Sequence, residues 1–378
     1  MTTSDILIDT PSVLARLADE FRRSPAVAVD LEADSMYHFQ EKVCLIQMAT
    51  PYRNAVIDTL RVRDLESLRS MFADPAVAKI FHGADYDVRS LYRDFSIEIA
   101  NLFDTQIAGT FLGIKATSLE AILQSRFGVA LDKKYQRKDW SRRPLPDEMI
   151  AYAAEDVRYL LPLAKMLTAE LKQKGRLEWV REECDLLSRV RPSHNNHEPL
   201  FLQFKGAGRL GPRSLAVLEA LLQYRRGVAE KKDRPLFKIF SNTSLLQLAI
   251  EKPDSTRRLS ESGVLSGKQL TMYGEGLVEA ILGARLIPAD DLPAYPRKKS
   301  RAMHPAVPDR VKALRNWRDK KARALDIEPA VLLNKSAMTA LATENPIEPP
   351  ALSAVEELKS WQKNEFGAEM VRVLRRVG

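Results

Sequence analysis

A repeat with a period of 93 residues constrains the second half of this chain. Beyond residue 200, apolar side chains recur at helical spacing, and the same residue types return 93 positions later. Nine positions match at this offset. The first five are Leu218, Leu221, Tyr224, Arg225 and Ala229, which correspond to Val311, Leu314, Trp317, Arg318 and Ala322. The other four are Asp233, Leu248, Ala249 and Pro253, which correspond to Asp326, Leu341, Ala342 and Pro346. This shared offset predicts two copies of one small all-α domain.

Breaker-rich segments divide the 378 residues into domains. The polar run 189–199 and the run 286–299, which contains Pro and Asp, are typical of linkers. They leave a first domain at 1–188, one helical copy at 200–285 and a second copy at 300–378. The second copy is more divergent, because Pro235 and Phe237 have no counterparts at the same offset.

Residues 1–188 alternate between strand and helix patterns, which is typical of an α/β domain. Short runs rich in Val and Ile predict strands at 26–32, 43–49, 54–59 and 78–81. Helices are expected at 64–73, 86–94, 105–113, 117–127 and 146–171. Pro162 should interrupt the last of these helices.

Positive charge is concentrated in two segments of a chain whose net charge is +8. Residues 205–238 carry nine basic and three acidic side chains, and residues 297–323 carry eleven and two. The rest of the chain is therefore acidic. Localised positive charge predicts a polyanionic partner, although solvated helix faces would give the same pattern in either segment alone.

Other features favour the cytoplasm. The polar N-terminus lacks the pattern of a signal peptide, and no run approaches the roughly 20 apolar residues of a membrane span. Cys44 and Cys184 are the two cysteines, and both are expected to be reduced thiols.

Two carboxylates close the first predicted strand. Asp30 and Glu32 are separated by one residue, so both side chains point to the same face of a sheet. Burying two like charges together is costly, and a bound cation would relieve that cost. A strand end that emerges into solvent would explain the same pair equally well.

Two further acidic positions are weaker when taken alone. Tyr152 and Asp156 are four residues apart and share one face of a helix, a spacing that ordinary surface contacts also produce. Asp87 follows another strand at the start of a helix. Asp85 competes with it, and either residue could cap that helix.

Gathered in one pocket, these four carboxylates would suit phosphodiester hydrolysis. The reaction develops charge on the attacking, phosphoryl and leaving oxygens, and two divalent cations about 3.5–4 Å apart stabilise all three. Mg²⁺ prefers one or two carboxylates together with waters and substrate oxygens. Two ions therefore match four carboxylates, one of them shared.

In order and spacing, three motifs resemble those of the DEDD exonuclease superfamily, and specifically the ribonuclease D family. They are Val29-Asp30-Leu31-Glu32 through Cys44-Leu45-Ile46-Gln47, then Phe81-His82-Gly83-Ala84-Asp85-Tyr86-Asp87-Val88, and Asp139-Trp140-Ser141-Arg142-Arg143-Pro144-Leu145 leading to Tyr152-Ala153-Ala154-Glu155-Asp156. The last motif marks the tyrosine subclass. The resemblance selects Asp87 over Asp85. It implies a ribonuclease H-like fold, an α/β domain whose mixed five-stranded sheet is flanked by helices.

The helical copies are similar to HRDC domains, which are accessory nucleic-acid-binding modules. The first copy carries the resemblance in Tyr224-Arg225 and in Arg234-Pro235-Leu236-Phe237-Lys238-Ile239. One or two such modules behind an exonuclease is the arrangement of the ribonuclease D family, so the resemblance covers nearly the whole chain.

The resemblance also implies roles for the acidic residues. Asp30 would bridge two Mg²⁺ ions, which Mn²⁺ could replace, with Glu32 and Asp156 at the ion of the nucleophile and Asp87 at the other. Tyr152 would orient the attacking water, because its ordinary pKa near 10 makes it a poor base. The products would be nucleoside 5′-monophosphates released from a 3′ end.

Basic and aromatic side chains are candidates for nucleic-acid contacts. Beside the third motif these are Lys134, Arg142 and Arg143, and after the first motif Tyr37, His38 and Phe39 could stack on bases or form a hairpin tip. In the first helical copy the candidates are Arg225, Arg226, Lys231 and Lys232.

The expected function is that of a monomeric cytoplasmic 3′–5′ exoribonuclease that trims the 3′ ends of tRNA and other stable RNA precursors. A DNA exonuclease is one alternative, because the residues do not reveal a reader of the 2′-hydroxyl. A non-catalytic nucleic-acid-binding adaptor is another, although the presence of all four carboxylates and Tyr152 argues against it.

Overall fold

The computed structural model describes residues 5–192, 198–296 and 304–377. The chain forms two compact units. The first comprises Met1–Ala33, Val43–Pro192 and Ser300–Gly378, and the second comprises Asp34–Lys42 and Ser193–Lys299. Parts of the expected linkers 189–199 and 286–299 lie outside the described residues, and the domain boundaries given above stay predictions.

A mixed sheet of six strands forms the centre of the first unit, in the order β1-β4-β3-β2-β5-β6. The strands are β1 (Asp5–Ile8), β2 (Ala26–Ala33), β3 (Val43–Ala49), β4 (Asn54–Asp58), β5 (Ala78–Phe81) and β6 (Leu102–Asp104). Strands β2, β3 and β4 form an antiparallel meander, and β1, β5 and β6 are added in parallel. The sheet has one strand more than the five expected.

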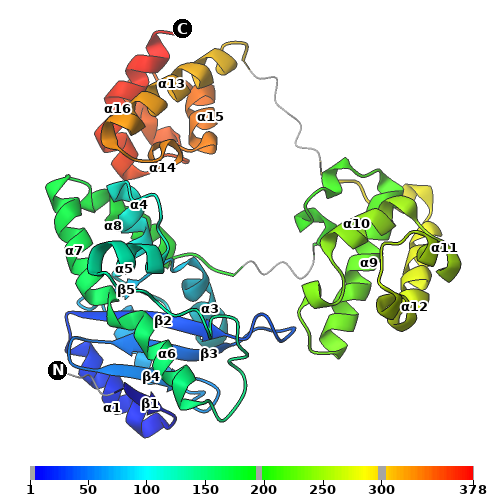
Figure 1. The fold of residues 1–378 in the computed structure, drawn as a ribbon. Coiled ribbons are helices and arrows are strands. Elements are labelled where there is room, and N and C mark those ends of the chain that lie inside the picture. The colour runs from blue at the N-terminus through cyan, green and yellow to red at the C-terminus, as the bar shows by residue number, and fades with distance from the viewer. Residues whose placement is uncertain (1–4, 193–197, 297–303, 378) are drawn as a thin grey trace. The chain divides into compact units, whose positions relative to one another are not determined.

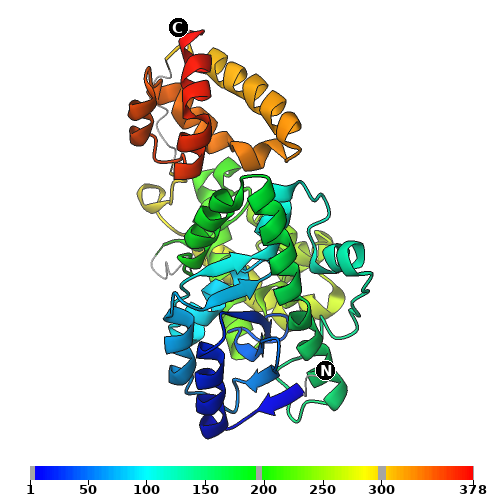
Figure 2. The ribbon, with the colours of Figure 1, turned by 90° about the vertical axis from the view of Figure 1, so that its left-hand side faces the viewer.

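Helices cover both faces of this sheet. The first unit contains α1 (Pro11–Arg22), α2 (Glu66–Ala73), α3 (Asp85–Phe95), α4 (Thr105–Leu112), α5 (Leu119–Phe127), α6 (Asp147–Arg158), α7 (Leu160–Gln173) and α8 (Leu177–Ser188). Helix α6 crosses β2, β3 and β4 on one face (Figure 1). Apolar side chains of α1 and α2 pack against the other face, where α1 lies alongside the sheet (Figure 2). Every residue of β3 is therefore buried.

The helix expected at 146–171 is two helices that meet at Tyr159. Pro162 explains the break, because it has no N–H to donate to the carbonyl of Arg158, four residues earlier. The new helix α7 begins at Leu160, which places Pro162 in its first turn, where a missing donor costs little.

The two helical copies share their element bounds at the predicted offset. The first contains α9 (Pro212–Lys231), α10 (Asn242–Glu251), α11 (Thr256–Glu261) and α12 (Gly267–Arg285). The second contains α13 (Val307–Leu325), α14 (Pro329–Leu332), α15 (Lys335–Glu344) and α16 (Ser360–Arg375), with a 3₁₀ helix at Pro349–Ala354 in place of α11. Asp233 and Asp326 both have a left-handed backbone, with φ of 45° and 51°. The predicted repeat is thus present in three dimensions.

The second copy packs on α4 and α8 within the first unit. Trp361 of α16 stacks on Trp179 of α8, with ring centroids 4.9 Å apart. The Glu182 carboxylate accepts hydrogen bonds from the backbone N–H groups of Ser360 and Trp361, at 2.6 and 2.7 Å, at the start of α16. Aromatic stacking and a helix cap supplied by another helix thus join the copy to the α/β domain.

No helix in the described parts of the chain combines the length and apolar character needed to cross a membrane.

Candidate active site

The end of β2 carries Asp30 and Glu32. In the antiparallel register these residues lie opposite Gln47 and Leu45 of β3, on the face that α6 covers. The register shifts between Glu32 and Ala33, so the paired strand ends in a bulge. Bulges redirect a chain at the edge of a site, and this one follows directly after the second carboxylate.

Burial separates Asp87 from its competitor Asp85. Both residues lie in the first turn of α3. The side chain of Asp85 is 60% exposed and is paired with Arg89 at 2.8 Å, whereas Asp87 is 7% exposed. Asp85 is therefore a partner within its own helix, and Asp87 is the carboxylate directed into the fold.

An aromatic slot holds Tyr152 one turn before Asp156 on α6. The ring of Trp140 stacks on Tyr152 with centroids 6.2 Å apart, and the ring of Tyr135 meets it edge-on at 5.6 Å. The Tyr135 hydroxyl donates to Glu148 of the same helix at 2.5 Å. These contacts restrict the ring of Tyr152 and so fix the position of its hydroxyl group.

Burial raises the pKa of all four carboxylates, and neighbouring carboxylates add to this effect for Glu32, Asp87 and Asp156. Burial raises the pKa of Asp30 to about 6. Burial together with the charge of Asp30 raises the pKa of Asp156 to about 8. Burial and then neighbouring carboxylates hold the pKa values of Glu32 and Asp87 well above their ordinary range. A cluster of this kind lacks positive charge, and bound cations would supply it.

An open cavity of about 420 Å³ lies beside this cluster. Asp30, Glu32, Tyr152 and Asp156 line it, together with side chains that the sequence did not single out as site residues: His82, Gln106, Lys133 and Gln136. Nothing local in the sequence shows which polar side chain faces a cavity.

Asp104 is a supporting residue that the sequence reasoning missed. Its carboxylate accepts hydrogen bonds from the N–H groups of Gly83 and Ala84 at 3.0 and 2.8 Å, and it also caps α4 through Gln106 at 2.7 Å. Asp104 thereby fixes the turn from which α3 presents Asp87. An acidic residue before a Thr-Gln helix start was the available signal.

Hard oxygen donors make the cluster suitable for Mg²⁺ or Mn²⁺. Among the residues that the structure describes, no three His, Cys, Asp or Glu side chains are grouped closely enough to enclose a single ion. The four carboxylates are instead spread over β2, α3 and α6, and waters and substrate oxygens would complete the shells of ions held there. The donor set therefore fits a pair of hydrated divalent cations.

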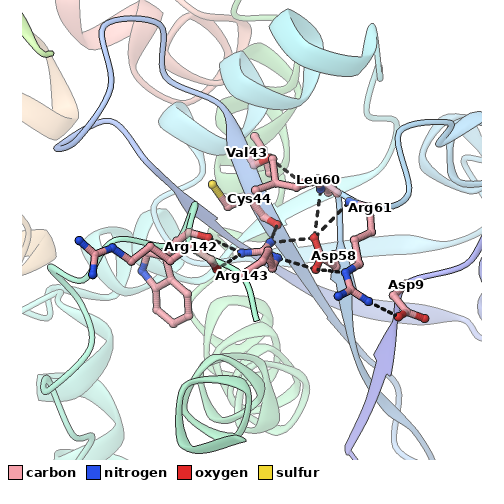
Figure 3. Close-up of polar contacts among 10 residues, drawn as sticks. Asp9, Val43, Cys44, Asp58, Leu60, Arg61, Arg142 and Arg143 are labelled. Atoms are coloured by element: carbon pink, nitrogen blue, oxygen red, sulfur yellow. Dashed lines mark hydrogen bonds and ion pairs between the residues drawn. The ribbon is translucent and has the colours of Figure 1, made fainter. Parts of the chain in front are cut away.

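Of the basic candidates near the third motif, Arg143 is committed to the fold. Its Nε and Nη2 atoms donate to the buried Asp58 carboxylate at 2.6 and 2.7 Å, and its other donors bond to backbone carbonyl groups (Figure 3). The phosphate contact predicted for Arg143 is therefore wrong, because no N–H group remains. Arg142 is 83% exposed, and Lys134 is 60% exposed while pairing with Glu148, so their phosphate contacts stay predictions.

The segment after the first motif packs on the first helical copy inside the second unit. His38 pairs with Asp233 at 2.7 Å, and the Phe39 N–H group donates to the same carboxylate at 3.1 Å. The ring of Tyr37 lies 4.4 Å from the ammonium group of Lys238, and Phe39 joins the copy's apolar core. Internal contacts thus engage all three residues, each of which is half-buried, and the predicted stacking of Tyr37, His38 and Phe39 on bases stays a prediction.

Arg225 also proves to be internal. It is 7% exposed, and its guanidinium group donates to the Phe240 carbonyl at 3.1 Å and to Asn242 at 2.7 Å. The prediction that it faces solvent or phosphate is wrong, because this position of α9 points into the core of the copy. Lys231 and Lys232 are exposed and Arg226 is half-buried, so these three stay candidates.

Family comparisons match both halves of the chain. Residues 6–172 match a model described as a 3′–5′ exonuclease, and residues 214–281 and 308–374 each match the HRDC domain. Over 97% of its length the chain is 31% identical to ribonuclease D of Granulibacter bethesdensis, of which it covers 91%. The chain belongs to the ribonuclease D family. It is accordingly a 3′–5′ exoribonuclease with a mixed α/β exonuclease domain followed by two HRDC domains.

Solved structures agree with membership of the ribonuclease D family. The chain covers 99% of Escherichia coli RNase D, described as an exoribonuclease involved in structured RNA processing, with a TM-score of 0.75 and 26% identity. It also resembles the catalytic core of RRP6 from Trypanosoma brucei, with a TM-score of 0.64 and 30% identity over 75% of this chain and 80% of that one.

Proposed function

We propose that this ribonuclease D family member trims the 3′ ends of tRNA and other stable RNA precursors to nucleoside 5′-monophosphates, using two Mg²⁺ ions that Mn²⁺ can replace. The observation that carries the proposal is the cluster of four carboxylates on β2, α3 and α6, whose pKa values are all raised and three of which line an open cavity. We further propose that it acts as a cytoplasmic monomer.

Each carboxylate has a distinct place in this proposal. Asp30 would be shared between the two ions, Glu32 and Asp156 would hold the ion of the attacking water, and Asp87 would hold the other. When bound, the ions supply Lewis acidity, a more acidic water and neutralisation of the developing charge. Metal ligation by these residues would also relieve the repulsion that accompanies their burial.

Tyr152 acts as a hydrogen-bond donor and not as a base. Burial, followed by the charges of Asp156 and Glu32, raises the pKa of Tyr152 above its ordinary value. The hydroxyl therefore keeps its proton at neutral pH, and the slot formed by Trp140 and Tyr135 aims it. A fixed donor beside Asp156 suits the orientation of a water molecule before attack.

Digestion of matched oligonucleotides tests this function. A 5′-labelled RNA should shorten stepwise from its 3′ end with Mg²⁺ and should stay intact with EDTA, and a DNA of the same sequence should be cut more slowly. Asp30→Asn should abolish digestion while RNA binding persists. Equal rates on RNA and DNA would remove the RNA assignment, and a fully active Asp30→Asn variant would remove the metal-site assignment.

A further inference from the structure

A buried amide without a hydrogen-bond partner lies in the middle of the sheet. Gln47 of β3 is 0% exposed, and neither its Nε2 nor its Oε1 atom bonds to any group in the described parts of the chain. Buried polar groups are nearly always satisfied, and one that is not weakens the folded state. An apolar side chain of similar length would avoid this cost, so the fold alone does not account for Gln47.

The register places Gln47 beside Asp30. The two residues are directly opposite each other on neighbouring antiparallel strands, so their side chains share one face with Cβ atoms roughly 4.5–5.5 Å apart. On the same strand and the same face, Leu45 packs with Val56 in the cluster under α6. Gln47 is thus a polar amide that lies between the apolar Leu45 on its own strand and the Asp30 carboxylate on the neighbouring strand.

Asp30 is a half-buried carboxylate directly opposite this amide, and its oxygen atoms can accept hydrogen bonds. The amide of Gln47 offers two N–H donors and needs only a side-chain rotation to direct one of them at a carboxylate oxygen. Groups that support metal-ligating side chains commonly act in this way.

We propose that Gln47 is a positioning residue for Asp30: when the divalent cations are bound, its Nε2 group donates a hydrogen bond to the Asp30 carboxylate and fixes which oxygen atoms face them. The inference rests on the proposed function and deepens it, because it assigns a second residue to the same site. Gln47 does not touch the cations or the RNA, and it acts through Asp30.

Two variants test this role against a purely structural one. Gln47→Leu replaces the amide with an apolar side chain one bond shorter, whereas Gln47→Glu keeps the shape and replaces the donor with an acceptor. Met48→Leu is the matched control, because Met48 is the next residue of β3, is 0% exposed and belongs to the core on the other face of the sheet. Thermal unfolding in EDTA, Mg²⁺ titration calorimetry and RNA digestion are measured for all three variants.

We expect Gln47→Leu to raise the thermal stability of the protein and to lower its affinity for Mg²⁺. Without metal, Gln47→Leu should unfold about 2–5 °C above the wild-type protein, since an unsatisfied amide is gone. Its Mg²⁺ affinity should fall about tenfold to a hundredfold, with a matching loss of kcat. Gln47→Glu should lose still more, through repulsion of Asp30, and Met48→Leu should change neither property by much.

Two results would overturn the proposal. One is a Gln47→Leu protein that binds Mg²⁺ and digests RNA as the wild-type protein does. The other is a Gln47→Leu protein that unfolds well below the wild-type temperature in EDTA, because the amide would then have a structural partner. A wild-type protein that neither binds Mg²⁺ nor digests RNA would instead remove the proposed function, while a stability gain in Gln47→Leu would still assign the amide to a site.

Discussion

The two HRDC copies share one fold but present different surfaces. In the first copy the exposed Lys231 and Lys232 and the half-buried Arg226 lie at the end of α9. The residues at the same positions of the second copy are Ala324, Leu325 and Asp319. At these three positions the second copy therefore lacks the basic side chains of the first, although it has kept the helices and their core.

The turn after the first long helix, which contains Asp233 in the first copy and Asp326 in the second, contacts a different part of the chain in each copy. In the first copy the Asp233 carboxylate accepts the Phe39 N–H group and pairs with His38. In the second copy the Leu325 carbonyl accepts from Arg176 at 2.7 Å, and the Asp326 carbonyl lies so close to Gly113 that a Cβ atom there would stand 2.1 Å away. The difference teaches that two copies of one fold can use equivalent positions for different contacts within the same chain.

The largest expected effect is a difference in stability between substitutions at one equivalent position of the two copies. Trp361→Ala should destabilise the first unit by about 3–5 kcal/mol, because it removes a buried ring that stacks on Trp179. Lys268→Ala, the equivalent position in the first copy, changes an exposed side chain and should be nearly neutral. Urea unfolding measures both, and a neutral Trp361→Ala would break the comparison.

The buried acidic cluster belongs to the first unit and should make that unit sensitive to pH. Because burial raises the pKa of Asp156 to about 8, the folded state binds its proton more tightly than the unfolded state does. Stability without metal should therefore fall as the pH rises from about 4 to about 8. Asp156→Asn should recover on the order of 1–3 kcal/mol at the upper end.

Unfolding in EDTA near the two ends of this pH range measures that gain. Asp85→Asn is the control, because its exposed carboxylate pairs with Arg89 and lies outside the cluster. A gain for Asp156→Asn that is independent of pH, or an equal gain for Asp85→Asn, would contradict a shared buried charge.

For RNA binding, substitutions in the first copy should have the larger effect. Replacing Arg226, Lys231 and Lys232 with Ala should lower the affinity and reduce the salt dependence, by about 0.7 in the logarithmic slope for each single-strand phosphate contact that is lost. The control replaces three exposed residues of the second copy, Lys312, Arg315 and Lys320, for the same change in charge. Equal losses would show that both copies bind.

The smallest expected effect concerns the pair between Asp233 and His38. Asp233→Asn should destabilise the second unit by roughly 0.2–1 kcal/mol, because the pair with His38 is largely exposed. The hydrogen bond from His38 lowers the pKa of Asp233, so this contribution is present above pH 4 and is lost as the pH falls through the lowered pKa. Asp290→Asn, which alters an exposed carboxylate, should show no such pH dependence.

Local periodicity predicted most of the framework of the fold. The spacing of Asp30 and Glu32 fixed their common face, and the repeat predicted equivalent helices before their structure was known. The short strands β1 and β6 escaped notice, whereas β5, which is as short as β1, was predicted from its apolar run.

Contacts between distant segments could not be read from the sequence. Arg143 and Arg225 looked like phosphate ligands, because composition reveals a charge but not the carboxylate or carbonyl that satisfies it. His38 meets Asp233 across 195 positions, and the cross-strand pairing of Gln47 with Asp30 depends on a register that the sequence does not state. Such partners are fixed only when the chain folds.

Digestion of a 3′-terminal RNA substrate by Asp87→Asn and Asp85→Asn tests the central claim most directly. The two carboxylates are two residues apart in the same helical turn, and they differ in burial and in contact with the cluster. The account predicts that Asp87→Asn loses activity by roughly a hundredfold or more, while Asp85→Asn stays within about twofold of the wild-type protein. Equal activity in the two variants, or a greater loss in Asp85→Asn, would contradict it.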